Sequence, residues 1–138
     1  MTEKEVTDID KERLVHSATA VRQNAYAVYS GYRVGAAVLD ELGRVHTGCN
    51  VENSSFPLGT CAEANAIGAM IAAGGKRIIA IAALGGREEL EDCTPCGGCR
   101  QIIQEFSDGN TQVFLLGEHG EVETHTIDTL LPLSFRLR

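Results

Sequence analysis

Two apolar segments that lie close together in the sequence limit the possible folds most strongly. Thr60–Ala73 carries Glu63 and Asn65 as its polar side chains after the first residue, and it suits a helix that is buried nearly all round. Ile78–Leu84 is a continuous apolar run bounded by charge and by two glycines, which is typical of a strand covered on both faces. Because such a helix and such a strand need packed layers around them, these segments predict a layered α/β domain.

The remaining elements follow from apolar spacing and from turn residues. A stripe at steps of three and four predicts a first helix over Asp10–Val28, capped by Asp8 or Asp10 and ended by Ser30 and Gly31. A glycine-containing turn predicts a hairpin of two strands, Arg33–Leu39 and Arg44–Val51. Further along we expect a helix over Cys96–Phe106 with Ile102, Ile103 and Phe106 facing inward, strands over Val113–Leu116 and Val122–Thr126, and a short helix over Thr126–Leu131. The predicted fold is a three-layer α/β/α sandwich around a mixed sheet of about five strands, in one domain over residues 1–138.

Charge and hydropathy narrow the possible partners. The 12 Lys and Arg residues against 19 Asp and Glu residues give a formal net charge of −7, which argues against nucleic-acid binding and against editing of polynucleotides. The N-terminal segment is charged, and the longest apolar stretch, Ala62–Ala73, is shorter than the roughly 20 residues of a membrane span. We therefore expect a cytoplasmic protein with no membrane partner.

Five cysteines, an odd number, favour thiols with a function over a disulfide framework. Cys96 and Cys99 form a Cys-x-x-Cys motif directly after Pro95, which by itself fits a redox pair, half of a structural zinc site or two incidental thiols. Pro95 at the presumed start of a helix places both sulfurs in its first turn. There the helix dipole and free N–H groups stabilise thiolates, which are good metal ligands.

A second motif, Cys61-x-Glu63, also falls at the start of a helix. Glu63 there can simply stabilise the helix dipole, but a carboxylate in so apolar a helix is costly unless it is paired or working. If the strands before the two helices are adjacent, the three sulfurs converge and can hold one zinc ion with a fourth position open for water. Glu63 beside that water is placed to move protons.

The order Cys-x-Glu followed by Pro-Cys-x-x-Cys resembles the zinc nucleobase deaminases. Along most of its length the chain is similar to the homotetrameric-type cytidine deaminases. The segments that carry the resemblance are Tyr29–Ala37, Gly48–Asn53, Cys61–Glu63, Pro95–Gln101 and Leu130–Phe135.

The resemblance implies a hydrolase with one zinc per chain, held by Cys61, Cys96 and Cys99. Glu63 would pass protons from water to the ring nitrogen N3 and to the departing amine. Cytidine and deoxycytidine would become uridine and deoxyuridine with release of ammonia. Within the same superfamily, an aminonucleoside-antibiotic deaminase of the blasticidin type is the alternative.

The resemblance also implies a set of substrate-binding residues. The backbone at Ala62 and Thr94 would hold the base edge and the exocyclic amine, and Asn50 and Glu52 would bind the ribose hydroxyls. An amide and a carboxylate two residues apart on a strand share one face and offer complementary donors and acceptors. The alternative for these two is a turn at the end of the strand.

Three aromatic residues match positions near the family's site. Tyr32 replaces the usual phenylalanine against the pyrimidine ring, and Phe56 and Phe135 lie nearby, the latter supplied by a neighbouring subunit. The partner would then be a second copy of the chain in a homotetramer whose sites are completed between subunits. Each of these aromatics could equally belong to the core.

The sequence departs from the family at Ala64, where an arginine usually hydrogen-bonds the zinc thiolates. Because three thiolates leave Zn²⁺ with a formal charge of −1, helix dipoles or another cation must offset it, with Arg33 and Arg100 as the candidates. Cys49 is expected in a buried strand, and Cys93 near the metal without being a ligand. The histidines show no ligand spacing and are expected to be structural or on the surface: His16, His46, His119 and His125.

Two other classes of function stay open at this point. A non-catalytic zinc-binding module would use the same three cysteines without needing Glu63. A thiol redox protein would use Cys96 and Cys99 reversibly and hold no metal.

Overall fold

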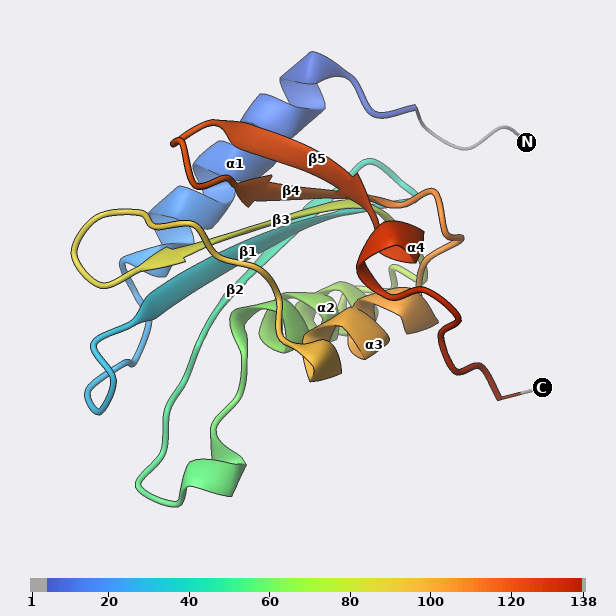
Figure 1. Cartoon of the computed structure of the whole chain (residues 1–138). Coiled ribbons are helices and arrows are strands. Elements are labelled where there is room, and N and C mark those ends of the chain that lie inside the picture. The colour runs from blue at the N-terminus through green and yellow to red at the C-terminus, as the bar shows by residue number, and fades with distance from the viewer. Residues whose placement is uncertain (1–4, 138) are drawn as a thin grey trace.

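The structure is a computed structural model that describes residues 5–137. A five-stranded mixed sheet in the order β2-β1-β3-β4-β5 has α1 on one face and α2 with α3 on the other, as Figure 1 shows. The predicted three-layer α/β/α sandwich is therefore confirmed. The elements are α1 (Asp8–Arg22), β1 (Arg33–Asp40), β2 (Val45–Cys49), a 3-10 turn (Phe56–Leu58), α2 (Ala62–Ala72), β3 (Ile78–Gly86), α3 (Gly97–Glu105), β4 (Gln112–Leu116), β5 (Val122–Thr126) and α4 (Ile127–Leu130).

Strand β3 is the centre of the molecule. All nine of its residues are buried, and it pairs antiparallel with β1 and parallel with β4. Its alternate residues enter two separate cores: Ile81 and Ala83 pack towards α2 and α3, and Ala80 and Ala82 pack towards α1. The apolar run in the sequence thus predicted a doubly covered strand correctly.

Helix α1 differs from its predicted range at both ends. It begins after Thr7, whose hydroxyl accepts a hydrogen bond from the backbone N–H of Asp10, while the Asp10 carboxylate accepts one from the Thr7 N–H. It ends at Arg22 rather than at Val28, which is exposed. The chain leaves the helix because Tyr26 pairs with the segment after β2, its N–H donating to the carbonyl of Asn50 at 3.0 Å. The apolar spacing continues past Arg22 by coincidence.

Two glycines let both helical layers touch the β1–β2 hairpin directly. A Cβ atom on Gly35 would lie 2.0 Å from the carbonyl oxygen of Ala18 in α1. On Gly48 it would lie 2.3 Å from the backbone nitrogen of Ala66 in α2. Because real Cβ atoms do not come so near, no larger residue fits at either place without moving a helix.

Burial of two helices differs from expectation. One side of α2 is open in the single chain, where Gly68, Ala69, Ile71 and Ala72 are exposed. In α3 the buried position belongs to Ile103, so Ile102, one residue away on the helix, turns partly outward. Within residues 5–137, no helix is both long enough and apolar enough to cross a membrane.

Candidate active site

Three of the five cysteines meet where α2 and α3 begin. Cys61 is the N-cap residue of α2 and Cys96 is the N-cap residue of α3, and Cys99 lies one turn into α3. The Cys96 sulfur accepts a hydrogen bond from the Cys99 N–H at 3.4 Å. The three sulfurs all lie within 4.8 Å of one another, and this is the candidate metal centre among the described residues.

The helices converge by a different route from the one expected. The strands that precede them, β2 and β3, are not adjacent, because β1 lies between the two. Both helices lie on the same face of the sheet and pack against each other, which brings their first turns together. The shared face, rather than neighbouring strands, therefore assembles the ligands.

The donor set fits zinc. A tetrahedral ion with Zn–S bonds of about 2.3 Å holds its sulfurs roughly 3.8 Å apart, which is compatible with three sulfurs that all lie within 4.8 Å of one another. Burial raises the pKa of Cys61, and burial together with the charge of Glu63 raises that of Cys99, whereas the N–H of Cys99 lowers the pKa of Cys96. Three thiolates next to a carboxylate therefore need a cation to coexist.

Glu63 is the second residue of α2 and is only 5% exposed. Its carboxyl group interacts with the Cys99 side chain, and burial raises its pKa above the usual range. A buried carboxyl group that can hold a proton at the edge of a cavity is suited to proton transfer.

The sulfur cluster opens into a cavity of about 380 Å³. All but one of the side chains or backbone groups expected to bind substrate line it: Tyr32, Asn50, Glu52, Phe56, Ala62 and Thr94. Phe135 is the exception, since it is 68% exposed and lies in the C-terminal segment beside Arg136, at a different hollow. Sequence reasoning missed Val34, Val51, Gly59 and Thr60 as further lining residues, although strand alternation from Tyr32 could have found Val34.

Comparison with known proteins decides the family. A model of the cytidine and deoxycytidylate deaminase zinc-binding region matches residues 8–115, which is most of the chain. The chain belongs to this family. Its relatives include a cytidine deaminase of Sporosarcina psychrophila, 38% identical over 127 residues and covering 92% of each chain. Another is a cytidine deaminase of Mycobacterium tuberculosis, 41% identical over 130 residues, or 94% of this chain and 92% of the relative.

Solved structures of the same family share the fold. A crystal structure of cytidine deaminase from Burkholderia pseudomallei matches with a TM-score of 0.81 at 39% identity, over 90% of this chain and 98% of that one. A crystal structure of cytidine deaminase from Mycobacterium tuberculosis matches with a TM-score of 0.80 at 37% identity, over 93% and 98% respectively.

In this deaminase fold, Asn50 and Glu52 follow β2 rather than lying within it. The Asn50 side chain accepts a hydrogen bond from the Val34 N–H at 2.8 Å and donates one to the Tyr32 carbonyl at 2.9 Å. Glu52 accepts hydrogen bonds from the N–H groups of Tyr29 and Ser30 and from the Ser30 hydroxyl, whose bond lowers the pKa of the carboxyl group. Both residues therefore hold the cavity wall together as well as lining it.

Tyr32 and Cys93 form a pair inside the cavity. Burial, followed by the hydrogen bond to Cys93, raises the pKa of Tyr32, so the phenol stays protonated. Cys93 lies outside the three-sulfur cluster but lines the same cavity, and its expected place near the metal without being a ligand stays a prediction. Cys49 is half-buried at the end of β2 rather than fully buried, so its expected place in the core is only partly right.

The two candidate cations for offsetting the thiolate charge differ in position. Arg33 is exposed, and strand alternation turns it away from the cavity that Tyr32 and Val34 line. Arg100 lies in the first turns of α3, where it donates 2.8 Å hydrogen bonds to the carbonyls of Pro95 and Leu130. Of the two, Arg100 is the cation on the metal side of the sheet.

Proposed function

We propose that this chain hydrolyses the exocyclic amine of cytidine and deoxycytidine, giving uridine or deoxyuridine and ammonia. Cytidine deaminase is the description shared by curated relatives that align with 92% of the chain. The observation that carries the proposal is the meeting of three cysteine sulfurs with a buried carboxyl group, Glu63, beside a cavity of nucleoside size.

Cys61, Cys96 and Cys99 would hold the zinc ion, one per chain. When bound, zinc acts as a Lewis acid that makes water a good nucleophile near neutral pH. Glu63 takes a proton from the attacking water and delivers it to N3 of the ring while the oxygen adds to C4. It then moves the second proton to the amine, which leaves as ammonia, so the two protons of one water molecule are both used.

The remaining cavity residues would bind and orient the nucleoside. Tyr32 packs against the pyrimidine ring, and the backbone of Ala62 and Thr94 holds its polar edge. Asn50 and Glu52 bind the ribose hydroxyls: the Asn50 amide uses one donor and one acceptor within the protein, which leaves one of each free. The Glu52 carboxylate accepts three hydrogen bonds and retains acceptor capacity.

Assembly into a homotetramer would complete the site. Phe56 lines the outer edge of the cavity, while Phe135 is exposed at a distance from it in the same chain. Exposed apolar residues also gather on α2, where Ile71 projects from a side rich in alanine and glycine. We therefore place Phe135 of a second copy at the cavity of the first. The five free cysteines suit a reducing compartment such as the cytoplasm.

The test measures zinc content, oligomeric state by light scattering, and loss of the cytosine absorbance for the purified protein. E63Q keeps the size of the side chain and should retain about one zinc per chain while kcat falls by about 10²–10⁴. Normal turnover by E63Q would contradict the mechanism, whereas zinc binding without any turnover by the wild-type protein would favour a non-catalytic zinc-binding module. Faster turnover of blasticidin S than of cytidine would favour the aminonucleoside alternative.

A further inference from the structure

Arg22 is the last residue of α1, and its guanidinium group is buried. Among the residues that the structure describes, its hydrogen-bond partners are all backbone carbonyl oxygens. The residue is 4% exposed. Its Nε donates to the carbonyl of Arg33 at 3.0 Å, and its Nη2 donates to that of Gly86 at 2.8 Å. The same Nη2 lies 3.4 and 3.2 Å from the carbonyls of the next two residues, Arg87 and Glu88. A buried charge is costly unless it is well partnered, so this cluster of carbonyls is built around it.

These carbonyls belong to the two chain segments that form one wall of the active site. Arg33 is the first residue of β1 and directly follows Tyr32, which lines the cavity. Gly86 is the last residue of β3 and directly follows Gly85. A Cβ atom on Gly85 would lie 3.0 Å from Cε1 of Tyr32, so the aromatic ring rests on that glycine. Arg22 therefore joins the two backbones one residue away from the place where Tyr32 touches β3.

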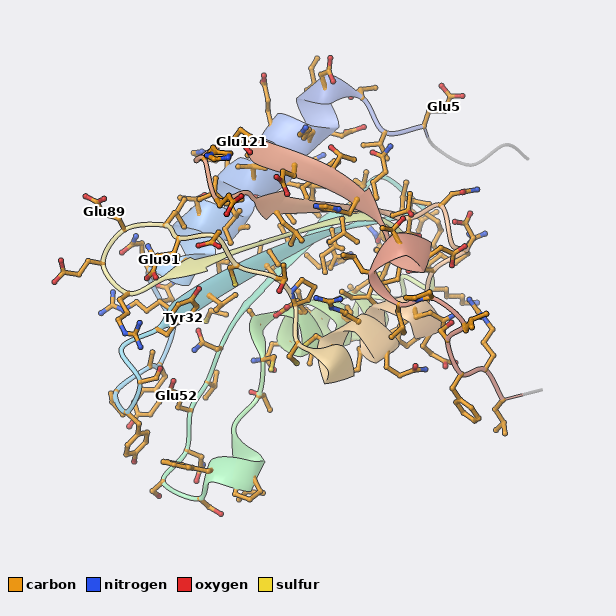
Figure 2. The ribbon with its side chains drawn as sticks, viewed as in Figure 1. Glu5, Tyr32, Glu52, Glu89, Glu91 and Glu121 are labelled. Carbon is orange, nitrogen blue, oxygen red and sulfur yellow. The ribbon has the colours of Figure 1, made fainter. Side chains whose placement is uncertain are left out.

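The loop that continues from Gly86 is folded tightly over the same place. A Cβ atom on Gly86 would lie 1.9 Å from the carbonyl oxygen of Glu89, and the N–H of Glu91 donates to the Gly85 carbonyl at 2.8 Å. Figure 2 labels Tyr32, Glu89 and Glu91 at this end of the sheet, where β1 begins and β3 ends.

The loop also reaches the cavity. Its first residue, Arg87, places a guanidinium group 5.8 Å from the centre of the Tyr32 ring. The loop then runs to α3, as the yellow segment of Figure 1 shows, and on the way supplies Cys93 and Thr94 to the cavity lining. Three groups thus surround the Tyr32 side chain: Gly85 next to Cε1, Arg87 over the ring, and Cys93 at the hydroxyl.

We propose that Arg22 is a positioning residue for pyrimidine binding. Its four hydrogen bonds fix the start of β1 against the end of β3, and this fixes the Tyr32 ring at the angle that the base requires. The inference rests on the proposed deaminase function, since Tyr32 must contact the base for its placement to matter. Arg22 itself lies behind the wall, on the α1 side, and touches neither the cavity nor the sulfurs.

The test is a double-mutant cycle between Arg22 and Tyr32. R22K keeps the charge but loses the planar group that reaches several carbonyls, and R22Q keeps two donors without a charge. We expect either variant to raise the KM for cytidine about tenfold with a change in kcat of less than about threefold, at unchanged zinc content. In a Y32A background, where the wall is already lost, the same substitutions should change KM less than about twofold.

The matched control is T111V, which removes a buried side-chain hydrogen bond to the other end of β3. The buried Thr111 hydroxyl donates to the carbonyl of Ile78, the first residue of β3, at 2.8 Å. T111V should lower the melting temperature while KM stays the same. If Arg22 acts on stability alone, R22K should behave like T111V and leave KM unchanged. If Arg22 acts independently of Tyr32, the fold-change in KM caused by R22K should be the same in the wild-type and Y32A backgrounds. Either result would overturn the proposal. So would the absence of folded protein for both R22K and R22Q, and failure of the wild-type protein to deaminate cytidine would instead refute the proposed function.

Discussion

Cys61 and Cys96 are the N-cap residues of two different helices, and their sulfurs lie no more than 4.8 Å apart. The strands that precede the two helices, β2 and β3, do not pair with each other, because β1 lies between them. The metal centre is therefore a tie between two helices, so metal binding should stabilise the helical layer formed by α2 and α3.

Removal of zinc is expected to abolish turnover. It should also lower the melting temperature by about 10 °C, because a ligand whose concentration is about 1,000 times its Kd adds about 4 kcal/mol to the free energy of unfolding. Calorimetry with and without a chelator measures the shift. Thiol titration gives a second readout, since three of the five free cysteines should become reactive only after the metal is removed. Full activity in protein stripped of its metal would contradict the assignment.

Introducing the family's usual arginine tests how the thiolate charge is offset. We expect A64R to change kcat/KM less than about tenfold, because the N-termini of α2 and α3, where the cysteines lie, already offset part of the charge. A64Q, which lengthens the side chain without a charge, is the matched control. A rise of more than about tenfold in A64R alone would show that the site lacks a substitute.

Asp40 gives a pH-dependent contribution to stability far from the cavity. Burial by itself raises the pKa of this fully buried carboxyl group, but hydrogen bonds from His46, Arg44 and Leu42 outweigh burial and hold the pKa below its usual value. The contribution is therefore complete above the unfolded pKa of about 3.9 and is lost as the pH falls through the lower folded value.

D40N should remove this pH dependence. At pH 7 we expect a loss of about 2–4 kcal/mol in the free energy of unfolding, because the carboxylate accepts bonds from Arg44 and His46 at 2.9 and 2.8 Å. Urea unfolding at pH 7, 5 and 3 measures both effects. Equal slopes of stability against pH in the two proteins would contradict the assigned role of Asp40.

Gly48→Ala should disturb the active site by pushing α2 away from the sheet. The added methyl group would meet the backbone of Ala66 at 2.3 Å, so α2 must move away from β2. We expect a loss of about 2–4 kcal/mol in stability and weaker zinc binding, since Cys61 moves with the helix. G68A, on the open side of the same helix with nothing within 4 Å of the added Cβ atom, is the control. It should leave zinc binding unchanged and raise the free energy of unfolding by up to about 1 kcal/mol, because alanine favours a helix more than glycine does.

The sequence predicted the strands and the ligand helices well because each depends on local information. The nine-residue β3 and the N-cap cysteines follow from apolar runs, glycines and Pro95. The end of α1 was wrong because the tertiary pairing of Tyr26 with the segment after β2 overrides helical spacing.

The catalytic and metal-binding residues of the site could be predicted, but the hydrogen bonds that hold the cavity wall in place could not. The spacing of the cysteines and Glu63 indicates one zinc centre, whereas the bonds that Asn50 makes to Val34 and Tyr32 depend on a loop meeting a strand 16 residues away. Arg22 was likewise missed, because its carbonyl partners lie up to 66 residues along the chain and no local pattern marks them.

The position of β1 between the two strands that lead to the metal ligands also bears on how the protein folds. Cys61 cannot meet Cys96 until β3 has docked along β1, so the metal centre depends on one of the longest-range pairings in the sheet. During synthesis, the early hairpin and α2 can form while the nascent chain still lacks two of its three sulfurs. We therefore expect high-affinity capture of zinc only after β3 has docked on β1 and α3 has formed, so that the ion locks this pairing after it forms rather than nucleating it.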